Sequence, residues 1–331
     1  MPAIQPERLV QAIIDAIQES GFSGQLVSPL RRHPRRFLVT GTQGHKSLSV
    51  FAWTLTFGGR PSLRNEYRIQ MTSVESPLQL GSGGPTLLLG YEPTLNLFAG
   101  FDLGRHRTFT TGSPSVQIDI EVLRRSETEG LSFHRKSNAE IAIGIRPDQL
   151  MTYALNADLL HRYGREANIF RLLNRAVQLH EIPEEEVDGL STERQRIVQT
   201  VSRLSRDASF RKQVVFAYGN RCAVTRMQLR LVEAAHVLPV GAPESVDHVR
   251  NGIALSPTYH KAFDNGLIYL NEDYHMVVNA SQLHVLEGLN LAGGSEAFRS
   301  PLGRVFLPPD QAQWPARDFI RRANHFRQIR V

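Results

Sequence analysis

The sequence predicts an α+β protein: a β-rich mixed domain, then a helical linker, then a second domain built on two short strands and a helix. Short apolar runs separated by Gly- and Pro-rich turns fill the first half of the chain, which is typical of strands in a mixed domain. An acidic stretch with Glu at 184–186 interrupts this pattern. In the last third, two apolar runs precede a short helical pattern.

Composition is that of an ordinary folded protein. The chain has 331 residues, of which 41% are hydrophobic and 21% charged, enough for one large domain or two domains. The net charge of +6 fits a nucleic-acid partner, although the Arg-rich bias of a GC-rich genome explains it equally well. The single cysteine, Cys222, excludes an internal disulfide and a zinc site made of several cysteines.

No apolar run approaches the roughly 18 residues that a membrane span requires. The first 20 residues also lack the basic, apolar and small-residue order of a signal peptide. We therefore expect a cytoplasmic protein without a membrane partner.

The first domain is expected to span residues 1–163. Leu9, Ile13 and Ile17 predict an amphipathic helix over residues 6–20. Pro147 is expected to open the last helix, which runs to about residue 163. Between them we expect strands at 37–40, 48–57, 66–71, 86–89, 95–101, 116–120, 131–134 and 140–145, with a helix near 121–129. The acidic stretch makes residues 164–190 the expected linker.

The second domain is expected to span residues 191–331. Two helices, 192–204 and 207–218, should open it, and Asp207 is a plausible N-cap for the second. A core over about 229–266 follows, with strands at 229–237 and 253–255 and a helix over 259–264.

This core carries three short motifs. They are Glu233-Ala234-Ala235-His236, then Asn251-Gly252, then His260 followed by Phe263-Asp264. Their order and spacing resemble the ββα-metal nucleases of the HNH class, in the branch common among bacterial restriction endonucleases. The resemblance covers about residues 207–270 and implies metal-dependent cleavage of double-stranded DNA.

The resemblance also implies roles for five residues. His236 would be the general base, since neutral imidazole accepts a proton near pH 7. Asn251 would hold the loop that orients His236, or touch the metal. His260 and Asp264 stand four apart on one helix face and would bind a divalent cation, Mg or Mn, with Glu233 as a further oxygen ligand.

One position departs from the wider class. Many HNH nucleases carry Asp or His directly before the base, as a metal ligand, and this chain has Ala235 there. Either Glu233 supplies the oxygen, or water and the scissile phosphate complete the coordination.

Basic residues in the first domain suggest that it reads DNA. The candidate contacts are Arg31, Arg32, Arg35, Arg36, Arg64, Arg105 and Arg107. Taken one at a time, each is better explained as a solvated surface side chain, but as a set they favour contact with DNA. A specific sequence and a modified base both remain open as the target.

The leading hypothesis is a restriction or phage-defence endonuclease. One HNH site cuts one strand, so a double-strand break implies a homodimer or two sequential nicks. A second hypothesis is a DNA-binding regulator with a degenerate, inactive module, for which Ala235 is the main support. A third keeps the nuclease but has the first domain sense a small ligand or a partner, although no P-loop or Rossmann glycine motif supports this.

Overall fold

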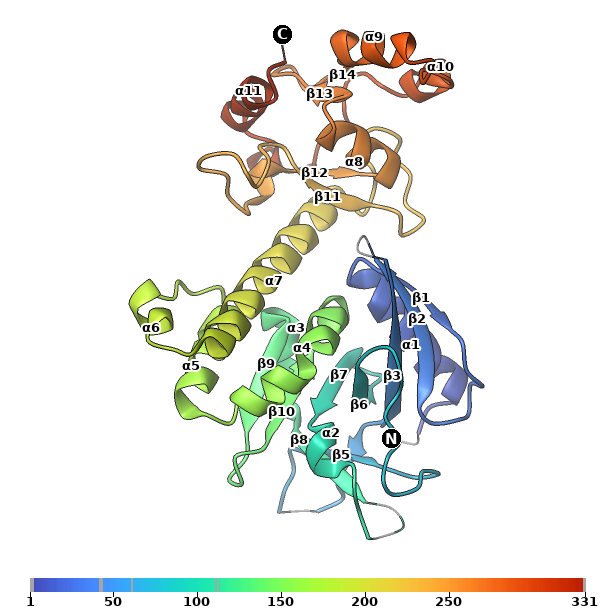
Figure 1. The fold of residues 1–331 in the computed structure, drawn as a ribbon, viewed down its shortest axis with the longest axis vertical. Helices are drawn as coiled ribbons and strands as arrows, with labels where there is room; N and C mark the ends of the chain where they lie inside the picture. The colour runs from blue at the N-terminus through green and yellow to red at the C-terminus, as the bar shows by residue number, and fades with distance from the viewer. Residues whose placement is uncertain (1–2, 42–43, 61, 111, 113, 330–331) are drawn as a thin grey trace. The chain divides into compact units, whose positions relative to one another are not determined.

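A computed structural model describes residues 3–41, 44–60, 62–110, 112 and 114–329. The chain divides into two compact units, Met1–Ala208 and Ser209–Val331 (Figure 1). Both units mix helices and strands, so the predicted α+β class is confirmed. Within the described ranges, no helix is both long and apolar enough to cross a membrane.

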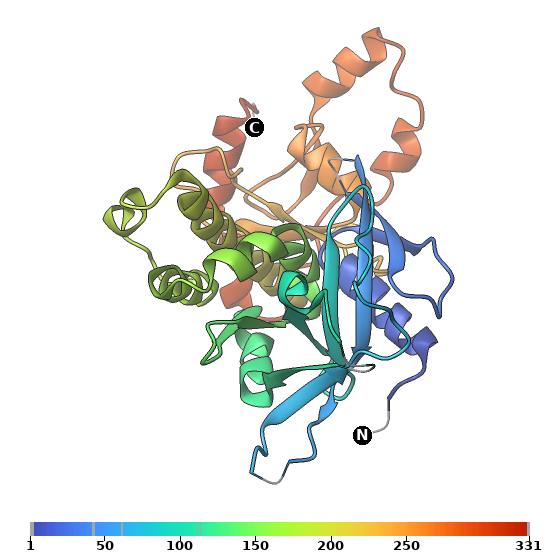
Figure 2. The same ribbon diagram turned by 60° about the horizontal axis from the view of Figure 1, so that its bottom comes forward.

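A seven-stranded sheet forms the centre of the first unit. Its neighbouring strands pair antiparallel except for β3 and β6, which pair parallel. The turned view shows the same sheet from another side (Figure 2). In spatial order its strands are β1 (Ser23–Leu26), β2 (Arg35–Gly41), β3 (Gly44–Thr54), β6 (Thr86–Glu92), β7 (Leu97–Phe101), β10 (Ile141–Ile145) and β9 (Leu131–Arg135).

Each face of this sheet buries its own core. Because side chains alternate along a strand, Val50 and Ala52 enter one core while Phe51 enters the other. The first core is completed by α1 (Pro6–Glu19), α4 (Leu150–Tyr163), α5 (Ala167–Val177) and the start of α7 (Thr192–Ala217). The second lies under α3 (Ile120–Glu129) and a small sheet of β4 (Thr56–Phe57), β5 (Glu66–Gln70) and β8 (Ser115–Asp119). Two short helices, α2 (Leu103–His106) and α6 (Glu184–Asp188), complete the unit.

Two sequence-based expectations are corrected here. Residues 164–190 are not a free linker, because α5 buries Ile169, Leu172 and Leu173 in the first core. The helices expected at 192–204 and 207–218 are one helix, α7. No Gly or Pro breaks it near Asp207, which therefore lies mid-helix rather than at a cap. The division between the two units falls within this helix.

After the end of α7, the second unit contains a two-stranded hairpin followed by a helix, the motif order that the sequence predicted. The strands β11 (Glu233–His236) and β12 (Gly252–Leu255) pair antiparallel, with His236 opposite Gly252. The first strand is shorter than the expected 229–237, because Leu229 and Arg230 have φ of 47° and 55°, outside the β region. The later elements are α8 (Pro257–Asp264), β13 (Ile268–Leu270), β14 (Met276–Val278), α9 (Ala280–Gly288), α10 (Ser295–Arg299) and α11 (Arg317–Phe326).

The end of α7 packs tightly on the hairpin. A Cβ at Gly252 would lie 2.2 Å from Cγ2 of Val214, so the approach requires glycine. Cys222 is fully buried in the same core, with its Sγ 3.8 Å from the Ser256 hydroxyl oxygen. This thiol is therefore part of the packing.

Candidate active site

His260 lies between two carboxylates. It stands on α8 with Asp264 one turn later, and α8 packs against β11, which carries Glu233. The Nδ1 atom of His260 is 2.6 Å from Glu233 Oε2, and its Nε2 atom is 3.3 Å from Asp264 Oδ2. The structure thus brings together the three residues that were predicted as metal ligands.

The two carboxylates also set the charge of this imidazole. Burial opposes the imidazolium form, but the hydrogen bond to Glu233 and the charge of Asp264 outweigh it and raise the pKa of His260. The same hydrogen bond lowers the pKa of Glu233. Because an ionised carboxylate only accepts hydrogen bonds, Nδ1 carries the proton that points to Glu233.

The geometry fits two direct metal ligands better than three. Glu233 and Asp264 lie against opposite nitrogens of the His260 ring, so their carboxylate oxygens do not converge on one point. In the described ranges, no three His, Cys, Asp or Glu side chains come close enough together to hold a metal ion. Two ligands at about 2.1 Å from an octahedral ion lie about 3 Å apart, which the Nε2 to Oδ2 distance allows. A carboxylate on the other imidazole nitrogen is a common partner of metal-binding histidines.

His236 forms a separate pair with Asp247. Its Nε2 atom lies 2.9 Å from Asp247 Oδ1, and its ring stacks on Phe210 with centroids 3.9 Å apart and 12° between planes. Nε2 must be the donor to the carboxylate, which leaves the lone pair on Nδ1. The side chain remains 19% exposed, so a water molecule can reach it.

Asn251 is fully buried and organises the loop between the two strands. Its Oδ1 accepts from the Leu238 N–H at 2.8 Å, and its Nδ2 donates to the carbonyls of Leu238 at 3.1 Å and Val246 at 3.0 Å. The Ser245 hydroxyl is 3.3 Å from the same Nδ2. All of these partners belong to the loop that leads to Asp247. Of the two roles left open for Asn251, this geometry favours holding the loop.

Arg327 contacts the residues that adjoin His236 and Asp264 in the chain. It follows α11, and its Nη1 donates to the carbonyl of Val237 at 2.9 Å while its guanidinium carbon lies 4.6 Å from the centroid of the Phe263 ring. Val237 follows His236, and Phe263 precedes Asp264. Burial lowers the pKa of Arg327 and the charge of Asp264 opposes that shift. Its buried Nε has no hydrogen-bond partner among the described residues.

The two histidine groups are not joined directly. Within the part of the chain that the structure describes, no hydrogen bond or ion pair links His236 with Glu233, His260 or Asp264. Strand alternation gives the reason, since Glu233 and His236 are three residues apart on β11 and point to opposite faces. Ala235, between them, is fully buried and offers no ligand atom.

Sequence reasoning missed Asp247 and Arg327. Asp247 lies eleven residues after His236 in an irregular loop, where no periodicity pairs the two. Arg327 lies 90 residues after Val237, in a tail whose arginines gave no signal to separate them. His248, beside Asp247, is exposed.

The arginines of the first unit that were predicted to contact DNA differ in their exposure to solvent. Arg35 is 4% exposed and donates to the carbonyls of Leu30 and Ala52, so it holds the chain and does not face solvent, contrary to the prediction. Arg107 is partly buried and donates to the Leu78 carbonyl. The other predicted contacts have exposed side chains: Arg31, Arg32, Arg36, Arg64 and Arg105.

Comparisons with known proteins bear on both units. Residues 46–154 match the family described as "Methylase-associated X1", and residues 222–271 match the family described as "HNH endonuclease". One solved structure, described as "Modification dependent TagI restriction endonuclease", has 14% identity and a TM-score of 0.31, covering 83% of this chain and 80% of that chain. A search of curated proteins gives no match. Residues 222–271 thus belong to the HNH endonuclease family, as their motifs predicted, and give the second unit a nuclease module.

Proposed function

We propose that this chain is a divalent-metal-dependent DNA endonuclease in which His236 is the general base. The observation that carries the proposal is the His236–Asp247 pair, held on the hairpin of a module that matches the HNH endonuclease family. A partly exposed imidazole with one nitrogen fixed by a carboxylate has its other nitrogen ready to accept a proton.

In this mechanism, Nδ1 of His236 takes a proton from a water molecule as the water oxygen bonds to phosphorus. The bond from phosphorus to the 3′ oxygen breaks, and this oxygen takes a proton from solvent water. The products are a 3′-hydroxyl and a 5′-phosphate, as the HNH resemblance implies. Asp247 stabilises the imidazolium that forms. Asn251 acts indirectly, because its hydrogen bonds hold the loop that carries Asp247.

A divalent cation, Mg or Mn, would be held by Nε2 of His260 and by Asp264. Such an ion supplies Lewis-acid stabilisation of the phosphate and of the leaving oxygen. Glu233 would orient His260 through Nδ1 instead of binding the ion itself. Arg327 would place a second positive charge near the phosphate, because it contacts Val237, next to His236, and Phe263, next to Asp264.

The first unit would select the DNA. Its match over residues 46–154 to a family described as methylase-associated supports a restriction or defence role, in which a specific sequence or a modified base marks the target. A double-strand break would then need a homodimer or two nicks, because each chain carries one HNH module.

A second candidate is a DNA-binding regulator with an inactive nuclease module. One observation favours it: Ala235 is fully buried and leaves the position before the base without a ligand. This candidate predicts metal-independent DNA binding and no cleavage.

The deciding experiment uses two preparations of one plasmid, one unmodified and one with modified cytosines. Each is incubated with wild type, His236→Ala or His284→Ala, in Mg, Mn or EDTA. His284 is a control of the same residue type, 88% exposed on α9. We expect metal-dependent cleavage by wild type and His284→Ala, and none by His236→Ala. DNA binding without cleavage in any metal would favour the regulator.

A further inference from the structure

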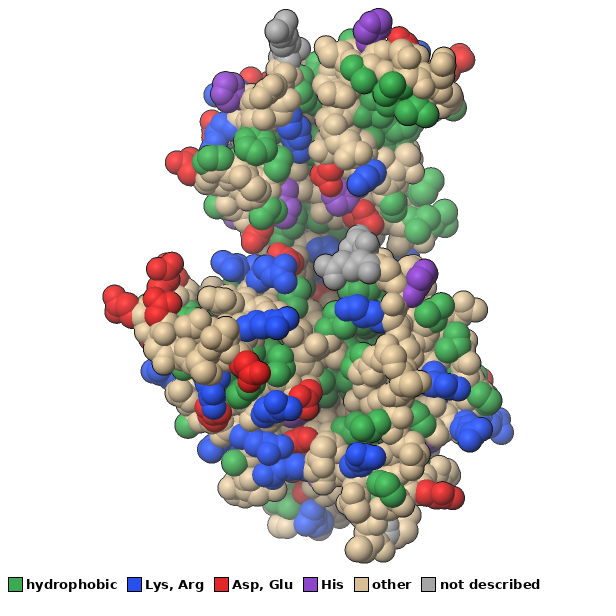
Figure 3. Space-filling view, in the orientation of Figure 1, with side chains coloured by type: hydrophobic (Ala, Val, Ile, Leu, Met, Phe, Trp, Pro, Cys, Tyr) green, Lys and Arg blue, Asp and Glu red, His purple; other side chains and the backbone are tan. Residues whose placement is uncertain are grey.

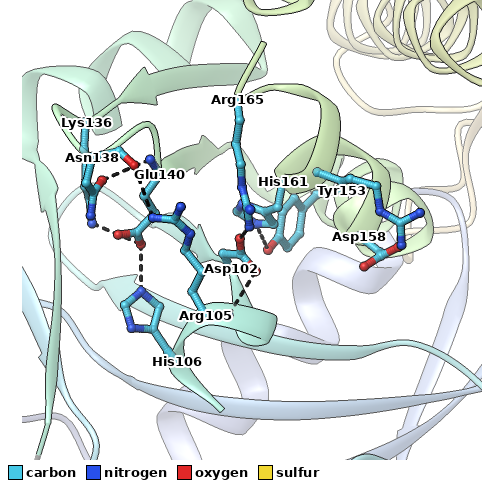
Figure 4. A network of polar contacts seen from close by, with 11 residues as sticks. Asp102, Arg105, His106, Lys136, Asn138, Glu140, Tyr153, Asp158, His161 and Arg165 are labelled. Atoms are coloured by element: carbon cyan, nitrogen blue, oxygen red, sulfur yellow. Dashed lines mark hydrogen bonds and ion pairs between the residues drawn. The ribbon is translucent and has the colours of Figure 1, made fainter. Parts of the chain in front are cut away.

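Buried carboxylates hold a cluster of cations in place on the first unit. The cluster lies where the segment after β7, the β9–β10 turn and the end of α4 meet (Figure 4). Lys and Arg side chains gather over this face in the space-filling view (Figure 3). We call it the braced patch, and it consists of Arg105, Arg135, Lys136 and Arg165.

Glu140 is the first brace. Its side chain is 5% exposed, and Oε1 lies 3.2 Å from Lys136 Nζ and 2.7 Å from His106 Nε2. The turn itself is fixed, because the Lys136 N–H donates to the Glu140 carbonyl at 2.8 Å. The carboxylate is thus covered, while the Lys136 side chain remains 20% exposed.

Asp102 is the second brace. One oxygen accepts from the Arg105 N–H at 3.3 Å at the start of α2, and the other pairs with the Arg165 guanidinium. The Asp102 side chain is 9% exposed against 35% for Arg165. Beneath them Tyr153 lies on Gly100, where a Cβ would come within 2.3 Å of the Tyr153 ring, so the floor of the cluster is tightly packed.

The two exposed arginines are tied to main-chain carbonyls. Nη1 of Arg105 donates to the Asn138 carbonyl at 3.3 Å, and Nε of Arg135 donates to the Arg165 carbonyl at 3.0 Å. Each bond uses one of the five N–H donors of a guanidinium, so several remain for a ligand. Arg105 and Arg135 are therefore positioned by neutral carbonyl groups and keep their positive charge for a ligand.

We propose that the braced patch binds the phosphodiester backbone of duplex DNA and sets the position of the first unit on it, an inference that rests on the proposed function. Guanidinium groups match phosphate geometry, and contacts of this kind fix register without reading sequence. A side chain that is already fixed loses less conformational entropy on binding. By contrast, Arg31 is 79% exposed and lies 3.7 Å from Glu7, so it would have to be ordered by the DNA.

The first test measures binding of a short fluorescent duplex by full-length His236→Ala protein in EDTA, which prevents cutting. In this background, Arg105→Ala with Arg135→Ala should raise the Kd about tenfold or more and lower the slope of log Kd against log salt by about 2. The matched control is Arg124→Ala with Arg171→Ala, two exposed arginines that lie outside the patch and are not among the predicted DNA contacts. The control should bind nearly as tightly as its parent. Equal losses in both double variants would overturn the proposal.

The second test separates bracing from simple charge. Glu140→Gln removes a negative charge next to the patch, so Coulomb's law alone predicts tighter DNA binding. Bracing predicts weaker binding, because Lys136 and His106 lose the group that positions them. Binding is compared at a temperature where both proteins are folded, as judged by their thermal midpoints. Unchanged or tighter binding overturns the proposal.

The outcomes also separate this inference from the function on which it rests. If the parent protein binds no duplex, DNA targeting by the first unit and the patch both fail. If the parent binds and Arg105→Ala with Arg135→Ala binds as well, the patch alone fails. Plasmid cleavage that is lost in His236→Ala supports the nuclease assignment in either case.

Discussion

The guanidinium of Arg327 lies over the ring of Phe263, with its carbon 4.6 Å from the ring centroid. If this cation stabilises the phosphate, Arg327→Met should lower kcat about 10²–10³-fold, since Met keeps the apolar contact and loses the charge. Arg327→Lys should keep only part of the wild-type kcat, because an ammonium group cannot stack on the Phe263 ring as a planar guanidinium does. Arg321→Met is the control, because Arg321 is 63% exposed on the preceding helix α11. A wild-type cleavage rate for Arg327→Met would reduce Arg327 to a packing role.

The pair of His236 and Asp247 predicts a non-additive loss. Asp247→Asn should lower the cleavage rate about 10–10³-fold, because the amide fixes the imidazole tautomer less well and does not stabilise imidazolium. The same change in a His236→Ala background should have no further effect. Single-turnover rates of the four proteins test this, and two independent, additive losses would show that Asp247 acts elsewhere.

The carboxylates around His260 predict a metal requirement that depends on pH. They raise the pKa of His260, and an imidazolium cannot bind a metal, so a falling pH makes protons compete with the ion. Below that pKa, the metal concentration for half-maximal activity should rise about tenfold per pH unit. Glu233→Gln should move this rise to lower pH and weaken metal binding at high pH. Metal titrations across pH provide the measurement, and a rise moved to higher pH by Glu233→Gln would contradict it.

The buried hydrogen bonds of Asn251 predict a structural defect when it is replaced. Asn251→Asp loses both Nδ2 donors and places a charge against two carbonyls, so local destabilisation of about 3–5 kcal/mol is expected. The amides of Val237 and Leu238 should then exchange with solvent faster. Undisturbed exchange together with lost cleavage would instead mean that Asn251 contacts the reacting groups.

Buried titratable groups predict that the first unit loses stability in acid. Although burial opposes it, the hydrogen bond from His106 and the charge of Lys136 lower the pKa of Glu140 to about 2. Stability from this carboxylate is complete above its ordinary pKa of 4.5 and is lost as the pH falls towards 2, a contribution of roughly 3 kcal/mol.

Two histidines shielded from solvent also make the first unit less stable as the pH falls, and their effect begins at a higher pH. Burial lowers the pKa of His161 to about 4 and of His33 to about 3, so both are neutral in the fold. Below pH 6.5 the unfolded chain binds protons that the folded chain excludes, and stability declines as the pH falls. The thermal midpoint should therefore drop steadily from pH 6.5 downwards. His161→Asn should flatten the upper part of that curve, and an unchanged slope would contradict the assignment.

The order and spacing of the three motifs, through their resemblance to HNH nucleases, predicted the nuclease module. The motifs at 233–236, 251–252 and 260–264 define a hairpin and a helix, and the structure forms both. The partners of these residues could not be predicted, because Asp247 and Arg327 approach from irregular or distant segments. Within the first unit, Arg35 and Arg36 were both predicted to contact DNA. The period of two in β2 buries the first and exposes the second, a signal that the sequence already contained.

The burial of Cys222 has a practical consequence for spectroscopy. It is the one cysteine in the chain, and its sulfur is packed in the core beside Ser256. A cysteine introduced at an exposed position such as 124 or 284 would be the accessible thiol for a maleimide dye or spin label. Native Cys222 could then stay in place while fluorescence or spin-echo distances report where DNA meets each unit.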